Sequence, residues 1–120
     1  MIAKEGSPLG LEGSGVCLAV GEGVDPSLVG KKVGFFVHGW ASHSMVPIHH
    51  VYELNEDQDL REAAASSINT FAACAQIHLT KEAGSKSAIC TAGASALAKM
   101  TYKLGQKEGI EVIGVVRREE

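Results

Sequence analysis

The 120-residue sequence lacks several features that would each point to a class of protein. Its three cysteines are an odd number without C-x-x-C spacing, so neither a disulfide framework nor a cysteine-based zinc site is indicated. Its formal net charge of −3 gives no general attraction for nucleic acid or for an anionic membrane. It has no apolar run of transmembrane length, and its first residues lack the apolar core of a signal peptide.

The composition is that of a folded domain. With 45% hydrophobic residues, the chain is long enough to bury a core as one domain or as parts of two. Cys17, Cys74 and Cys90 stand among apolar or small residues, and we predict that they are buried free thiols. That thiol usage is typical of a reducing compartment, so we expect a cytoplasmic protein, with an organellar form of a longer parent left open.

The most informative stretch lies near the end of the sequence. Ser87–Thr91 is a short run of small residues that predicts a strand buried on both faces, and Ala94–Lys107 has helical spacing of apolar residues. Gly109 is placed to stop that helix, and the β-branched run Ile110–Val116 predicts a second buried strand. A strand, a helix and a strand in this order predict a parallel pair joined by a right-handed crossover.

The turn between the first strand and the helix matches a dinucleotide-binding turn only in part. Of the three glycines in G-x-G-x-x-G, only Gly93 is present, while Ser95 and Ala98 take the second and third places. These are small substitutes, and a helix N-terminus still offers free N–H groups to phosphate. Small residues in such a turn are equally compatible with simple packing of the helix against the strand. The turn alone therefore does not distinguish nucleotide binding from packing.

Two arginines follow the second strand. In units that bind NAD an acidic residue near this place holds the ribose, whereas arginine suits the 2′-phosphate of NADP. Here the place holds Arg117 and Arg118. A solvated basic pair is the alternative, but the turn and the arginines together favour NADPH.

The first half of the sequence predicts a small β barrel or sandwich. Val16–Val20 and Lys32–Val37 read as strands, and Gly39–His50 continues them. Glu12 is either a buried functional carboxylate or a turn carboxylate. Four histidines fall within thirteen residues, but their spacing matches no zinc pattern, so we predict no metal site: His38, His43, His49 and His50.

A polar linker, Leu54–Asp59, separates the two halves. Asp59 is placed to cap a helix that begins at Leu60. Ala63–Ala65 and Phe71–Leu79 continue as helix, with a predicted break near Ser66–Asn69. The linker is therefore the candidate domain boundary.

Six pieces of the sequence together resemble the medium-chain dehydrogenase/reductase superfamily, in its zinc-free branch of quinone and enoyl reductases. They occur in family order and cover nearly the whole chain: Gly10–Gly15, Val20–Val24, Val29–Val33, Gly39–Ala41, Ala63–Ala73, and Thr91–Ala98 with Val116–Arg118. The resemblance implies a mixed α/β fold. Residues 1–58 would form part of a GroES-like β barrel, and residues 59–120 the first β-α-β unit of a Rossmann-type NADP-binding domain.

The resemblance also bears on metal and catalytic residues. Zinc alcohol dehydrogenases of the superfamily have a metal-binding histidine where this sequence has Leu11, and a zinc cysteine near Asn69 where it has none. No metal is therefore implied. Tyr52 and Tyr102 do not match the catalytic tyrosine of enoyl reductases, so no catalytic residue is assigned.

The activity implied is hydride transfer from NADPH to a quinone or an α,β-unsaturated carbonyl compound. Residues of the turn would hold the pyrophosphate and the arginines the 2′-phosphate, with Asn69 facing the cofactor: Gly93, Ala94, Ser95, Ala96, Arg117 and Arg118. Because family members are longer, the sequence looks like an internal fragment. The alternative hypothesis is a truncated chain that folds or binds nucleotide weakly without turnover. The expected partners are a small-molecule substrate and, through unpaired sheet edges, further copies of the chain.

Overall fold

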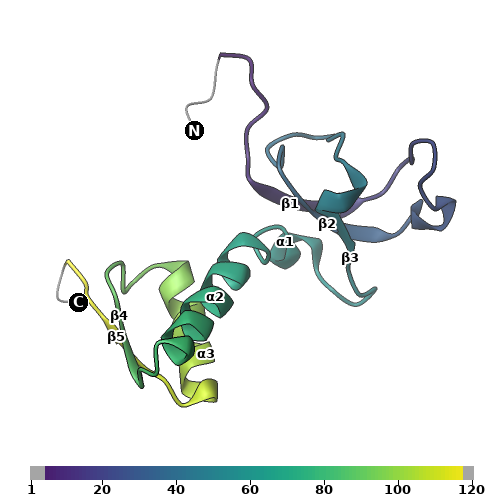
Figure 1. Cartoon of the computed structure of the whole chain (residues 1–120). Coiled ribbons are helices and arrows are strands. Elements are labelled where there is room, and N and C mark those ends of the chain that lie inside the picture. Colours follow the sequence, from purple (N-terminus) through teal and green to yellow (C-terminus); the bar gives the residue numbers. More distant parts are fainter. Residues whose placement is uncertain (1–4, 118–120) are drawn as a thin grey trace. The chain divides into compact units, whose positions relative to one another are not determined.

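The structure is a computed structural model that describes residues 5–117. The chain is mixed α/β and divides into two compact units, Met1–Ile68 and Asn69–Glu120 (Figure 1). The first unit contains an antiparallel sheet and the second a parallel strand pair with helices. No helix within residues 5–117 is both long enough and apolar enough to cross a membrane.

The sheet of the first unit has three strands in the order β1-β2-β3, formed by Glu12–Val16, Lys32–Phe36 and Val51–Glu53. Glycines make room for the aromatic side chains of neighbouring strands. Gly13 lies opposite Phe35, and a Cβ on Gly13 would come within 2.8 Å of the Phe35 ring. Gly34 lies opposite Tyr52, and a Cβ there would overlap the Tyr52 ring. Val33 of β2 is buried.

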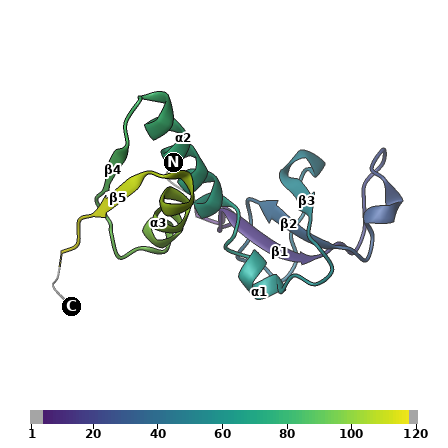
Figure 2. The same ribbon diagram turned by 90° about the horizontal axis from the view of Figure 1, so that it is seen from below.

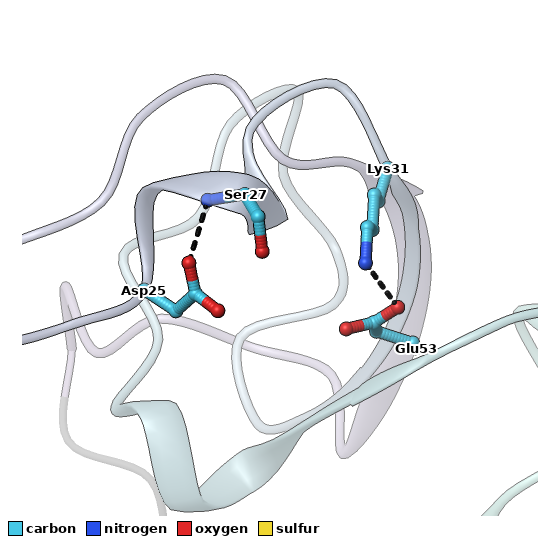
Figure 3. A network of polar contacts seen from close by, with 4 residues as sticks. All are labelled: Asp25, Ser27, Lys31 and Glu53. Carbon is cyan, nitrogen blue, oxygen red and sulfur yellow. Dashed lines mark hydrogen bonds and ion pairs between the residues drawn. The ribbon is translucent and has the colours of Figure 1, made fainter.

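Two short 3₁₀ helices, Pro26–Leu28 and Ile48–His50, join these strands. The carboxylate of Asp25 accepts a hydrogen bond from the Ser27 amide at 2.8 Å, and Lys31 pairs with Glu53 at 2.8 Å (Figure 3). The bond from Ser27 lowers the pKa of Asp25, and the bond to Glu53 raises the pKa of Lys31. These pairs fix an exposed loop and contribute little to stability, since water and salt screen them.

A polar network within the first unit attaches the next helix, and the residues that lead into the helix after it, to this sheet. Helix α1 (Leu60–Ala63) follows the sheet, and helix α2 (Ile68–Glu82) follows α1. The Glu12 carboxylate accepts hydrogen bonds from the amides of Ser67 and Ile68, at 2.9 and 2.8 Å. The Tyr52 hydroxyl bonds the Ser67 hydroxyl, and the Ser14 hydroxyl donates to the Leu60 carbonyl. Strands β1 and β3 thereby hold the α1–α2 connection.

Local cap signals in the sequence are confirmed. The Asp59 carboxylate caps α1 by accepting from the amides of Arg61 and Glu62, at 2.7 and 3.3 Å. The predicted helix break is also present, between Ala63 and Ile68. Helix α1 belongs to the first compact unit, which extends to Ile68. The sequence-based domain boundary after residue 58 stays a prediction.

The second unit is built on a parallel strand pair. Strand β4 (Ser87–Cys90) pairs with β5 (Glu111–Gly114), and helix α3 (Ala96–Glu108) connects them (Figure 2). Gly109 ends α3 with a left-handed φ of 70°, as predicted. The strand–helix–strand order predicted from sequence is therefore confirmed.

Small residues allow close packing in this unit. Ala98 is fully buried, and a Cβ on Gly105 would come within 2.6 Å of the Val112 side chain. Helix α2 packs on α3 through Ile77, which approaches Gly105, and through a hydrogen bond of 2.9 Å from the Thr101 hydroxyl to Gln76. The core consequently lies between the two helices and β5.

Three expectations for the strands and thiols are wrong. Val16–Val20 is not a strand, because β1 ends at Val16. The last backbone hydrogen bonds along this edge join Cys17 to Gly30 and Lys31, just before β2. Gly39–His50 does not continue the sheet, because Val37 and His38 adopt positive φ and end the extended backbone. The thiols are free, but Cys74 is exposed, and Cys17 and Cys90 are only partly buried.

The strands of the second unit are not buried on both faces as predicted. Val112 faces α3, so its neighbour Ile113 points to the opposite face. Ile113 lies opposite Ile89, and the two side chains are 50% and 71% exposed. The three-stranded sheet is consistent with part of a β barrel, and the barrel itself stays a prediction.

We predict that Glu12→Ala lowers the free energy of unfolding by about 1–3 kcal/mol, because the two amides before and at the start of α2 lose a charged acceptor. Urea denaturation of the whole chain measures this change. Glu22→Ala, which removes an exposed loop carboxylate, is the matched control and should leave the midpoint unchanged. Equal midpoints for the two variants would contradict the role of Glu12.

Lys81 and Glu108 form an ion pair between the ends of α2 and α3. The hydrogen bond from Lys81 lowers the pKa of Glu108 in the folded chain. On acidification the unfolded chain therefore binds this proton first, and the contribution of the pair is lost as the pH falls through the lowered pKa. We expect Glu108→Gln to melt below the unchanged chain at neutral pH but together with it at strongly acidic pH. A gap that stays constant with pH would contradict this assignment.

Candidate functional site

A cavity of about 680 Å³ opens where β4 passes into α3, beside the residues that follow β5. Its lining combines the turn with the end of the second strand: Thr91, Ala92, Gly93, Ala94, Ser95, Val115, Val116 and Arg117. Two segments that sequence reasoning singled out separately thus lie around one cavity. The parallel pairing of β4 with β5 brings them together, because the carboxyl ends of parallel strands lie at the same edge.

The turn and the first residues of α3 carry backbone N–H groups without intrahelical partners, and of these residues Ala94 and Ser95 line the cavity. Ser95 caps α3, and its hydroxyl accepts a hydrogen bond of 3.1 Å from the Ala98 amide. The amides of Ala96 and Leu97 precede the first intrahelical bond, so the helix itself offers them no acceptor. Within residues 5–117 the Ala94 amide donates to no protein acceptor either. Such a group of N–H donors at the positive end of a helix suits a phosphate.

The turn is pressed against β5. The Gly93 amide donates to the Val115 carbonyl at 3.0 Å, and the Val115 amide donates to Cys90 at 2.8 Å. A Cβ on Gly93 would come within 2.9 Å of the Gly114 Cα atom and 2.9 Å of the Tyr102 hydroxyl. Only glycine fits at this position without displacement of its neighbours.

Tyr102 is a part of the site that sequence reasoning did not identify. Its hydroxyl donates a hydrogen bond of 2.7 Å to the Gly93 carbonyl. In the sequence Tyr102 is only a tyrosine within a predicted helix. Its hydroxyl meets Gly93 and Gly114 in the folded unit, where the turn, β5 and α3 come together.

The remaining predicted site residues differ in whether they line the cavity. Arg117 lines the cavity, whereas Arg118 lies outside the described residues. Ala96 is exposed at the start of α3. Asn69 is half-buried near the start of α2 and is not among the residues that line the cavity. The binding roles of all these residues stay predictions.

In the described part of the first unit, a second cavity of about 390 Å³ is lined mainly by polar and acidic residues: Asp57, Gln58, Asp59, Glu62, Ala63 and Ser66. Among residues 5–117, no three histidine, cysteine or acidic side chains are placed to share a metal ion. Glu12, which the sequence left open as a functional or a turn carboxylate, lies in β1 and not in a turn, and its carboxylate accepts hydrogen bonds from the amides of Ser67 and Ile68. A functional role for it stays untested.

Comparisons with known proteins agree with this architecture. A scan of protein-family models and a search of curated protein sequences gave no match. Solved structures do match. A provisionally assigned NADPH:quinone reductase of Mesorhizobium loti superposes with a TM-score of 0.82 and 33% identity, over 92% of this chain and 34% of that protein. The human synaptic vesicle membrane protein VAT-1 homolog-like protein gives a TM-score of 0.74 and 25% identity, over 88% and 35%.

A third structure, the quinone oxidoreductase of Thermus thermophilus, shares the fold at a TM-score of 0.57 and 23% identity, over 71% of this chain and 30% of that one. Quinone reductases and VAT-1-like proteins are medium-chain dehydrogenases/reductases. The chain belongs to this superfamily, as its sequence motifs indicated. It spans about a third of the length of the proteins it matches.

We predict that Gly93→Ala destabilises the chain by about 1–3 kcal/mol, because the added methyl group meets the backbone of β5 and cannot be accommodated without displacement. Gly21→Ala is the control, since a Cβ there meets no atom within 4 Å. Thermal unfolding of both variants measures the difference. A Gly93→Ala chain as stable as the Gly21→Ala chain would contradict the close packing.

Proposed function

We propose that this chain carries the nucleotide-binding turn of an NADPH-dependent oxidoreductase of the quinone and enoyl reductase type. The observation that carries the proposal is the cavity lined by both the β4–α3 turn and Arg117. A dinucleotide with a 2′-phosphate needs both features, namely backbone donors for its pyrophosphate and a cation near its adenosine ribose. Membership of the superfamily and the name of the Mesorhizobium loti protein support NADPH in particular.

Each residue of the turn has a distinct role in this proposal. The amides of Ala94 and Ala96 donate to the pyrophosphate, and Gly93 and Ser95 let the nucleotide approach the backbone closely. Arg117 binds the 2′-phosphate through its planar set of donors, with Arg118 beside it in the sequence. Asn69 is proposed to face the nicotinamide end of the cofactor.

The reaction proposed for the whole enzyme is hydride transfer to a quinone or an α,β-unsaturated carbonyl compound. The nicotinamide supplies the hydride, and the protein orients and binds the cofactor. We assign no catalytic residue within this chain. The proposed partner is a small-molecule substrate, not nucleic acid or a membrane, with self-association through sheet edges and a cytoplasmic location.

We expect the whole chain to bind NADPH at least tenfold more tightly than NADH, at about 1.4 kcal/mol per factor of ten. Arg117→Glu should remove that preference, because a carboxylate repels the 2′-phosphate and accepts the ribose hydroxyl. Titration followed by nicotinamide fluorescence measures both affinities. Arg61→Glu makes the same charge change at an exposed position of α1 and should keep the preference for NADPH.

A folded chain that binds neither nucleotide would overturn the proposal. Binding without turnover of quinone or enone substrates would favour the alternative function, a nucleotide-binding part of such an enzyme that lacks activity by itself. The limited span of the chain relative to the proteins it matches is the observation behind that alternative.

A further inference from the structure

Tyr102 lies in the middle of α3, and its hydroxyl reaches the turn before that helix. The hydroxyl donates to the Gly93 carbonyl at 2.7 Å. The same atom lies so close to Gly114 that a Cβ on Gly114 would overlap it. Tyr102 thus contacts both the turn that begins the cavity and the end of β5, from a helix that packs beneath them.

The hydrogen bond to Gly93 determines how the next amide is oriented. The peptide bond between Gly93 and Ala94 is trans, so its C=O and N–H groups point in opposite directions. When the carbonyl is held toward Tyr102, the Ala94 amide is held away from it. Ala94 lines the cavity, and its amide has no protein acceptor within residues 5–117.

The opposite side of Gly93 is fixed as well. Its amide donates to the Val115 carbonyl at 3.0 Å, and Val115 stands two residues before Arg117. Both backbone polar groups of Gly93 are therefore hydrogen-bonded, the amide to Val115, which directly follows β5, and the carbonyl to Tyr102 of α3. These two bonds connect the turn both to α3 and to the segment that carries Arg117.

We propose that Tyr102 is a positioning residue, whose hydroxyl orients the Ala94 amide toward an anionic ligand such as the pyrophosphate of a dinucleotide and couples the turn to the end of β5. The ligand part of this inference rests on the proposed function, whereas the orientation of the amide does not. Tyr102 itself is not proposed to touch the ligand.

The test compares Tyr102→Phe with Tyr52→Phe in the whole chain. Both variants remove one hydroxyl that bonds within its own unit, but only the first concerns the turn. We expect Tyr102→Phe to weaken NADPH binding about three- to tenfold, the value of one lost hydrogen bond, and to shift the NMR resonance and speed the hydrogen exchange of the Ala94 amide. Tyr52→Phe should change neither.

A second pair of variants separates positioning from general loss of stability. Gly114→Ala displaces the hydroxyl and should weaken binding in the same way as Tyr102→Phe. In the double variant Tyr102→Phe/Gly114→Ala the methyl group has more room, so the combined loss of affinity should be smaller than the product of the two single losses. If the loss of NADPH affinity in the double variant equals the product of the two single losses, the proposed contact is overturned.

The outcomes distinguish this inference from the proposed function. If the unchanged chain binds no nucleotide, the proposed function fails. The positioning role of Tyr102 is then tested only by the NMR resonance and the hydrogen exchange of the Ala94 amide in Tyr102→Phe. If the Ala94 amide and the NADPH affinity of Tyr102→Phe both equal those of the unchanged chain, the positioning role is refuted.

Discussion

The close backbone approach of the β4–α3 turn to β5 is the constraint on which the second unit depends. Gly93 and Gly114 meet without side chains between them, and the hydrogen bonds of Gly93 to Val115 and Tyr102 leave the turn little freedom. This contact places the turn beside the residues that follow β5. Ala94, Ser95 and Arg117 therefore line one cavity, although they come from two segments of the sequence.

The turn shows how the demands of a glycine-rich motif can be met with fewer glycines. Glycine is needed at 93, where a methyl group would meet backbone atoms. Ser95 adds something that glycine cannot, a hydroxyl that caps the helix, and Ala98 packs with no exposed surface. Gly93 and Ala98 thus satisfy one steric requirement of the motif, the close packing of helix and strand. Its other requirement, the close approach of a nucleotide, belongs to the proposed function.

The first unit depends on a different interaction, the carboxylate of Glu12 at the amides of Ser67 and Ile68. A carboxylate placed before a helix satisfies donors that the helix cannot satisfy itself. Here it comes from a strand that precedes the helix by more than fifty residues, so it also joins the sheet to the α1–α2 connection. A carboxylate between glycines resembles a reactive group in sequence, yet its contacts are those of a structural one.

The sequence alone determined the features that depend on neighbours a few residues apart. The cap at Asp59, the stop at Gly109 and the strand–helix–strand order are set by local backbone requirements, and the motifs in family order identified the superfamily. Tertiary structure decided the rest. The partner of Glu12, the contact of Tyr102 with Gly93, and the end of β2 at Val37 and His38 depend on residues that approach only after the strands pair. Burial of Ile89 and Ile113 was misjudged for the same reason, because an apolar run specifies a strand but not which of its faces another element covers.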